Sequence, residues 1–199
     1  MEIGNRQLLD ILLEFDRFLT RKMTIIAIGG TALTLLGKKA STKDIDFCFI
    51  NEKNKELFKR SAKKLGYVLS SHTRLLGNGL AIDCYSSGHI FCIQLPEDYT
   101  DRAKKIQEMQ KIDLRVLDPI DLIITKAARF NDRDKEDLLV IIRNYPISQG
   151  ELVERWVGVM ANSLVRDAKE NLYLLLALFK QEGKLDQAAL RKAKKWFDE

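Results

Sequence analysis

The stretch Ile25–Ile50, IIAIGGTALTLLGKKASTKDIDFCFI, constrains the fold of this chain more than any other. Its apolar start predicts a buried strand, which a diglycine turn at Gly29 and Gly30, a short helix and a second strand follow. Asp44 and Asp46 lie in this second strand with one apolar residue between them. Because side chains alternate across a strand, we expect both carboxylates on one face, with their Cβ atoms roughly 7 Å apart.

A glycine pair beside two carboxylates suits phosphate chemistry. Carboxylate oxygens are preferred ligands of hard cations such as Mg²⁺, and two of them can hold one cation or a pair. Glycine lets the backbone approach a ligand closely, and the start of a helix presents free N–H groups to an anion. The stretch therefore predicts a phosphate cradle next to a metal site, as phosphoryl and nucleotidyl transfer require.

The spacing of these motifs resembles the signature of the DNA polymerase-beta-type nucleotidyltransferase superfamily. Gly29 and Gly30 are followed by thirteen residues and then by Asp44-Ile45-Asp46, and the wording GGTAL…DIDF is most similar to the small prokaryotic AbiEii-like and MenT-like branch. The resemblance covers roughly residues 25–142. It implies an α/β (α+β) fold, in which helices flank a small, twisted, mixed sheet.

A hairpin signal places a third carboxylate near the first two. Asn78 and Gly79 favour a two-residue type I′ turn, which would set Arg74 opposite Asp83. The resemblance implies that an acid on a neighbouring strand, here Asp83, completes the metal site and acts as base toward the attacking hydroxyl. The alternative is a structural aspartate that pairs with Arg74 across the hairpin.

A second block, residues 117–142, contains LDPIDLIITKAARFNDRDKEDLLVII. The resemblance implies that Lys126 contacts the nucleotide triphosphate, and that Asp134 or Asp137 supports the site. A lysine adds positive charge that metals alone do not supply. The alternative for this block, Arg129 included, is a solvated helix with ion pairs.

The candidate site thus has two groups of residues. The predicted catalytic and metal-binding residues are Asp44, Asp46 and Asp83. The predicted nucleotide-binding residues are Gly29, Gly30, Thr31, Thr42, Lys126 and Arg129. Thr42 stands where the toxin branch commonly has a serine, so contacts at that edge differ from the family pattern.

The cysteines and the hydropathy pattern predict a cytoplasmic protein. Cys48, Cys84 and Cys92 are too few, and odd in number, for a disulfide framework. No apolar run approaches the ~18 residues that span a bilayer, and no signal-peptide pattern is present. Cys84, Cys92 and His89, with Asp83, offer a zinc alternative, but their spacing matches no paired-cysteine motif, and the cysteines suit packing as small apolar residues.

The length and the helical pattern predict two parts. The chain has 199 residues, 46% of them hydrophobic and 31% charged, which suits a globular domain with an appendage. We expect a nucleotidyltransferase-like domain over residues 1–145 and a helical subdomain over residues 146–199. The net charge of +5 permits nucleic-acid binding. The basic end of the last helix, with Trp196, would contact RNA or is a solvated helix end.

These features predict an enzyme, a nucleotidyltransferase that uses Mg²⁺ or Mn²⁺. It would move NMP from a nucleoside triphosphate such as ATP to a hydroxyl of an RNA 3′ end, for example of tRNA, or of a protein. The resemblance also implies a partner protein from a toxin–antitoxin pair. The alternative is a non-catalytic nucleotide-binding or antitoxin-like module with the same fold. A third interpretation is kinase-like transfer of the γ-phosphate or modification of tRNA ends by a toxin.

Overall fold

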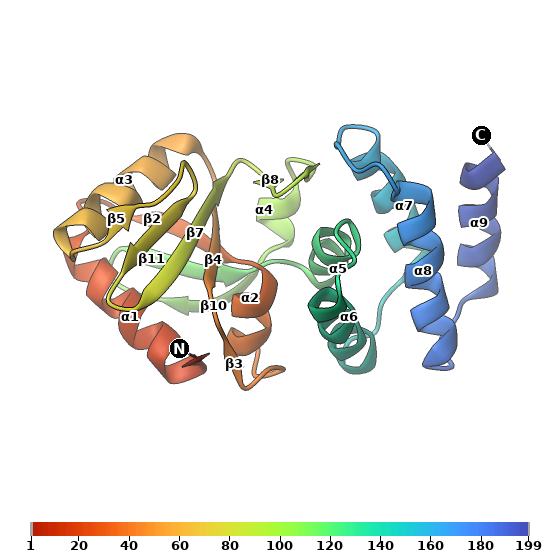
Figure 1. Cartoon of the computed structure of the whole chain (residues 1–199), viewed down its shortest axis with the longest axis horizontal. Helices are drawn as coiled ribbons and strands as arrows, with labels where there is room; N and C mark the ends of the chain where they lie inside the picture. Colours follow the sequence, from red (N-terminus) through yellow and green to blue (C-terminus); the bar gives the residue numbers. More distant parts are fainter. Residues whose placement is uncertain (1, 199) are drawn as a thin grey trace. The chain divides into compact units, whose positions relative to one another are not determined.

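The computed structural model describes residues 2–198, which form two compact units (Figure 1). The first unit is the chain up to Asp118 without Phe91–Pro96, and the second is Phe91–Pro96 with the residues from Pro119 onward. The mixture of helices and a mixed sheet confirms the predicted fold class. The domain boundary at residue 145 stays a prediction. Among the described residues, no helix combines the length and the apolar character needed to cross a membrane.

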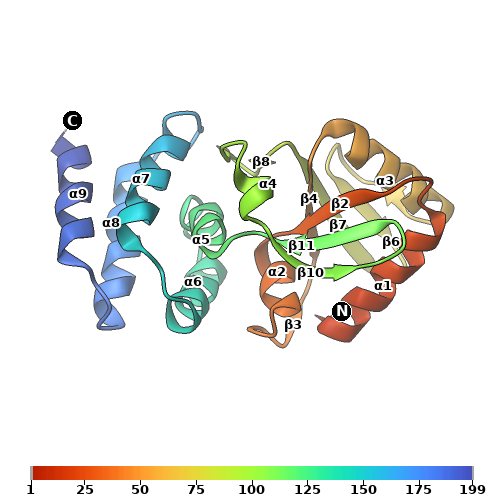
Figure 2. The ribbon, with the colours of Figure 1, turned by 180° about the vertical axis from the view of Figure 1, so that it is seen from behind.

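A twisted, mixed sheet forms the centre of the first unit (Figures 1 and 2). Its main strands are β2 (Met23–Ala27), β4 (Ile45–Phe49), β5 (Val68–Leu69), β6 (Arg74–Gly77), β7 (Leu80–Ser86), β10 (Lys104–Glu108) and β11 (Ile112–Val116). Their order is β10-β11-β2-β4-β7-β6-β5. Strand β2 runs parallel to β11 and antiparallel to β4, and β4 runs parallel to β7. Short strands flank the sheet: β8 (His89–Ile90) pairs with β7, and β1 (Ile3–Gly4) pairs with β3 (Ser41–Thr42).

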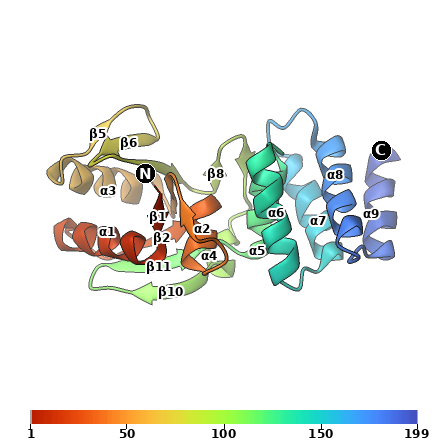
Figure 3. The same cartoon turned by 60° about the horizontal axis from the view of Figure 1, so that its bottom comes forward.

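An aromatic core fixes which side of β4 faces the helices. The helices of this unit are α1 (Asn5–Phe18), α2 (Gly29–Leu35), α3 (Glu52–Lys64) and α4 (Tyr99–Arg102). Helices α1 and α3 lie side by side (Figure 3), and Phe15 stacks on Phe58 with ring centroids 4.5 Å apart. Phe58 also contacts Phe47 and Phe49 of β4, at 6.0 and 5.0 Å. Because these β4 rings face the helices, alternation turns Asp46 to the opposite face.

Helices make up nearly all of the second unit. They are α5 (Pro119–Ala127), α6 (Asp132–Asn144), α7 (Gln149–Met160), α8 (Ala168–Gln181) and α9 (Gln187–Asp198), with the short strand β9 (Ile93–Gln94). Two of these helices have side-chain caps: Asn131 and Ser148 accept backbone N–H groups at the starts of α6 and α7. Gly183 follows α8 with a φ of +67°, as expected of a residue that ends a helix. Strand β9 does not extend back to Phe91, which has a φ of +54°.

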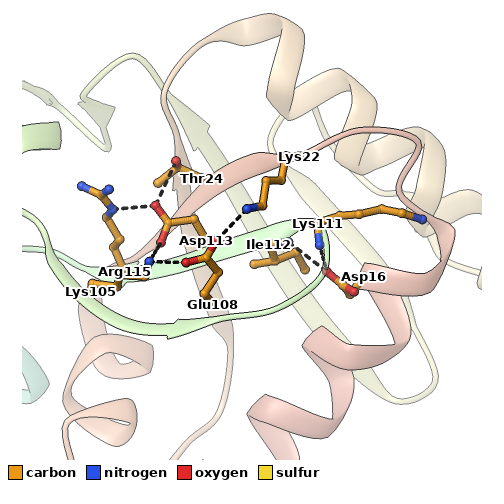
Figure 4. A network of polar contacts seen from close by, with 9 residues as sticks. All are labelled: Asp16, Lys22, Thr24, Lys105, Glu108, Lys111, Ile112, Asp113 and Arg115. Atoms are coloured by element: carbon orange, nitrogen blue, oxygen red, sulfur yellow. Dashed lines mark hydrogen bonds and ion pairs between the residues drawn. The ribbon is translucent and has the colours of Figure 1, made fainter.

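A buried carboxylate on α1 holds the turn between β10 and β11 (Figure 4). Asp16, which is 5% exposed, accepts the backbone N–H groups of Lys111 and Ile112 at 2.7 and 2.8 Å. On the surface nearby, hydrogen bonds from Lys105 and Lys22 lower the pKa of Glu108 to about 2. Exposed ion pairs contribute little to stability, so we assign the anchoring of this turn to Asp16.

Asp16→Ala is expected to lower the free energy of unfolding by about 2–3 kcal/mol, because it leaves two N–H groups without their charged acceptor. Glu108→Ala, the matched control on the same hairpin, should cost less than about 1 kcal/mol. Urea unfolding followed by circular dichroism measures both. Equal losses in the two variants would contradict the anchoring role of Asp16.

Candidate functional site

The three predicted aspartates come from two adjacent, parallel strands. Asp46 on β4 is the direct register partner of Asp83 on β7, so their Cα atoms are about one strand spacing, roughly 4.8 Å, apart. Asp44 lies just before β4. Ile45, between the two β4 acids, is fully buried on the other face, as the alternation predicted. The structure therefore brings Asp46 and Asp83 side by side.

An arginine lies among these carboxylates. One terminal nitrogen of Arg74 is 2.7 Å from Oδ1 of Asp44, and the other is 3.3 Å from Oδ2 of Asp83. The predicted hairpin register is confirmed, since Arg74 is opposite Asp83 and Asn78 has the positive φ of a type I′ turn. The pair between Arg74 and Asp83, the alternative role for this acid, is thus present. The contact between Arg74 and Asp44 was not predicted, because it depends on the order of the strands in the sheet, which the sequence does not reveal.

The carboxylates differ in their surroundings. The side chain of Asp83 is 13% exposed and that of Asp44 is 43% exposed. Burial raises the pKa of Asp83 above its ordinary value. The negative charge of Asp44 adds to this increase, and the positive charge of Arg74 opposes it. Three ionised carboxylates and one guanidinium carry a formal charge of −2 (three negative, one positive), which a divalent cation would balance.

Two threonine hydroxyls fix the backbone that presents the aspartates. The hydroxyl of Thr31 donates to the carbonyl oxygen of Asp44 at 3.2 Å and accepts the N–H of Asp46 at 2.9 Å. The hydroxyl of Thr42 donates to the same carbonyl at 2.9 Å. Both threonines are buried. These bonds position the carboxylates, while nucleotide binding by Thr31 and Thr42 stays a prediction.

The glycine pair brings the backbone against the acids. Gly29 and Gly30 are the first two residues of α2, so the predicted turn is part of this helix. Gly29 has a φ of +57°, and a Cβ there would lie 3.0 Å from Oδ2 of Asp46. A Cβ on Gly30 would lie 2.8 Å from Oγ1 of Thr42. A Cβ at either position would therefore force a side-chain oxygen to shift, and at Gly29 the backbone conformation also favours glycine.

Lys126 and Arg129 form ion pairs within the second unit. The ammonium of Lys126 is 2.5 Å from Oδ2 of Asp137 and 3.6 Å from Oδ1 of Asp134, and all three residues are at most 5% exposed. Arg129 contacts Asp134 at 2.8 Å and stacks over the ring of Phe91. The ion pairs of the alternative interpretation are present, but Lys126 is buried, so the expectation of a solvated helix is wrong at this residue. Nucleotide binding by Lys126 and Arg129 stays a prediction.

The donor chemistry of the site suits a hard divalent cation. Asp44, Asp46 and Asp83 offer only oxygen ligands from neighbouring strands. No set of three His, Cys, Asp or Glu side chains within residues 2–198 is already arranged to hold a metal, and at the acids Arg74 lies between two of the carboxylates. Cys84, which directly follows Asp83, is fully buried, and burial raises the pKa of its thiol to about 12. It packs as an apolar strand residue.

The chain belongs to the family described as "Nucleotidyltransferase of unknown function (DUF6036)", which residues 6–155 match. This membership confirms the prediction that the chain belongs to a nucleotidyltransferase family. The finer assignment to the AbiEii-like and MenT-like branch stays a prediction. A comparison with curated proteins gives no significant match.

Three solved structures are similar to this chain. JHP933 from Helicobacter pylori is 15% identical with a TM-score of 0.48, and the match covers 96% of this chain and 88% of that one. A candidate nucleotidyltransferase from H. pylori is 14% identical with a TM-score of 0.47, covering 94% and 86%. A candidate nucleotidyltransferase from Thermotoga maritima is 16% identical with a TM-score of 0.40, covering 58% and 80%. These likenesses are too distant to add to the family assignment.

Proposed function

We propose that this protein is a divalent-metal-dependent enzyme that transfers NMP from a nucleoside triphosphate to a hydroxyl acceptor. One observation carries the proposal: two carboxylates and a glycine backbone lie together. Asp46 and Asp83 are register partners on parallel strands, and the backbone of Gly29 lies close to the Asp46 carboxylate. Membership of a nucleotidyltransferase family supports the same chemistry.

The proposed roles follow from the chemistry of the side chains. Asp44, Asp46 and Asp83 would hold Mg²⁺ or Mn²⁺, which when bound would neutralise charge on the triphosphate. Gly29 and Gly30 leave room for phosphate oxygens. The acceptor oxygen bonds to the α-phosphorus, the bond from this phosphorus to the bridging oxygen breaks, and pyrophosphate leaves. Asp83, beside Asp46 on the neighbouring strand, would accept the hydroxyl proton.

A hollow beside Asp44 supports substrate binding in the first unit. Its volume is about 710 Å³, and it is lined by Lys43, Asp44 and the tip of the β6–β7 hairpin. This volume is in the range of small-molecule sites, and the lining carries charges of both signs, Lys43 against Asp44 and Glu2. We assign this hollow to part of the nucleotide or of the acceptor.

An RNA 3′ end, such as that of tRNA, is the first acceptor class to test, with a protein hydroxyl as the second. In the second unit, Trp196 borders a hollow of about 510 Å³ that Arg166 and Lys169 also line. The lining also includes Asp167 and Glu170, so its charges balance, and Trp196 is the feature of this hollow that suits base stacking. A toxin–antitoxin partner and a cytoplasmic location belong to the same proposal, on the resemblance of GGTAL…DIDF to the AbiEii-like and MenT-like branch.

Incubation with each α-³²P-labelled nucleoside triphosphate, Mg²⁺ or Mn²⁺, and total tRNA or cell lysate tests the proposal. Label on an RNA or protein band, absent with Asp44→Asn/Asp46→Asn, would establish transfer and the acceptor class. Label that comes only from γ-³²P-ATP would instead indicate kinase-like transfer. Stoichiometric nucleotide binding without label would favour the non-catalytic module, an alternative that the Arg74 bridge also supports.

Gly29→Ala is expected to lower the transfer rate about 10- to 100-fold, because the added Cβ displaces the Asp46 carboxylate and small misplacements of catalytic groups are costly. The matched control is Gly158→Ala on α7, where a Cβ would meet no atom within 4 Å. It should keep full activity and gain about 0.5–1 kcal/mol of stability. Steady-state rates and thermal melts measure both. An active Gly29→Ala protein would contradict the tight contact.

A further inference from the structure

We propose that Arg74 is an internal counter-ion, which holds Asp44 and Asp83 until a divalent cation binds and releases them when it binds. The inference rests on the proposed function, since it concerns the same carboxylates. It adds an exchange step, in which a guanidinium and a metal compete for the same oxygens.

The geometry of the bridge carries the proposal. Arg74 extends from β6 and uses different terminal nitrogens for the two acids, Asp44 at 2.7 Å and Asp83 at 3.3 Å. Asp44 lies just before β4, and Asp83 lies in the middle of β7. The guanidinium therefore links two strands through their carboxylates, as a cation shared between the same carboxylates would.

Electrostatics explain why such a residue is needed. Without Arg74, three carboxylates would lie close together on one face of the sheet, and the one at Asp83 is largely buried. Like charges at this spacing repel each other strongly where water is partly excluded. Arg74 reduces this repulsion before metal binding, so it keeps the acids in place without a bound ion.

The exposure of Arg74 explains how the exchange can occur. Its side chain is 40% exposed, whereas that of Asp83 is 13% exposed. The guanidinium can therefore turn toward water while the strand that carries it stays paired. Once a divalent cation takes the carboxylate oxygens, the released arginine adds a positive charge beside a bound triphosphate, to which guanidinium groups bind well.

Mn²⁺ binding to the purified protein without nucleotide, measured by electron paramagnetic resonance and calorimetry, tests the exchange. Arg74→Met should bind Mn²⁺ about 10-fold more tightly than the unchanged protein, because no competing cation has to leave. Arg74→Lys should fall between the two, since one ammonium cannot bridge both acids with two separate nitrogens. Arg115→Met is the matched control on β11, where the arginine pairs with Asp113 at 2.9 Å, and it should not change the affinity.

The outcomes separate this inference from the proposed function. If Arg74→Met and the unchanged protein bind Mn²⁺ equally, while Asp46→Asn weakens binding, the metal site stands and the exchange is wrong. If none of these proteins binds Mn²⁺, both proposals are overturned. Circular dichroism confirms folding, and if Arg74→Met does not fold, Arg74→Lys decides by the same criterion.

Discussion

Asp46→Asn is expected to lower the rate of nucleotidyl transfer about 1,000-fold while the protein stays folded. An amide has nearly the shape of the carboxylate but lacks its negative charge, so it would weaken the hold on the cation. A loss of about 4 kcal/mol of transition-state stabilisation, within the contribution of a catalytic metal, corresponds to this factor. Asp46 is half-buried and lies beside Asp83, so the substitution removes repulsion and should not destabilise the fold.

The matched control for Asp46→Asn is Asp113→Asn. Asp113 also lies on a strand of the same sheet, but it pairs with Arg115 on β11 and is the register partner of Thr24 on β2 (Figure 4). Its variant should keep the rate of the unchanged protein. Transfer of α-³²P label and urea unfolding are measured on all three proteins. Retained transfer by a folded Asp46→Asn protein would overturn the catalytic assignment.

The local geometry of the site could be predicted because it depends on near neighbours in the sequence. The Asn78-Gly79 turn fixes the hairpin register and so sets Arg74 opposite Asp83. Strand alternation likewise places Asp46 on the face opposite Ile45. Both rules need only a few consecutive residues.

Features that depend on strand order could not be predicted in this way. The register of Asp46 with Asp83 requires β4 to lie beside β7 in parallel, which no local pattern encodes. The charged strand β10, KKIQE, lacks the apolar alternation of a half-buried strand because it is at the edge of the sheet. In the sequence, Asp16 does not differ from other polar residues of a helix. In the structure it accepts backbone N–H groups from residues that follow it by 95 and 96 positions in the chain.

The buried lysine shows the same limit in the second unit. Its helix, α5, and the start of α6, which Asn131 caps, depend on short stretches of sequence. The packing of α5 against α6 then turns Lys126 toward Asp134 and Asp137, which the sequence offered only as alternative supports of the nucleotide site. Because all three charged groups are buried, we expect a mutation that breaks this cluster to cost much more stability than the loss of an exposed ion pair would.

Lys126→Met is expected to lower the free energy of unfolding by about 3–5 kcal/mol, because it removes one partner from a buried charge cluster. Asp137 would lose an ion pair of 2.5 Å, while Asp134 would keep Arg129. Both tryptophans of the chain, Trp156 and Trp196, lie in the second unit, so urea unfolding followed by tryptophan fluorescence reports on this unit.

Two variants sharpen this test of Lys126. Lys135→Met on α6 removes an exposed pair with Asp132 and should cost less than about 1 kcal/mol. Lys126→Met/Asp137→Leu should recover most of the lost stability, because replacing both buried charges by apolar groups removes the unpaired carboxylate. If Lys126→Met instead unfolds like the unchanged protein and binds nucleoside triphosphate about 10-fold more weakly, the ammonium serves the phosphates, and the structural role is wrong.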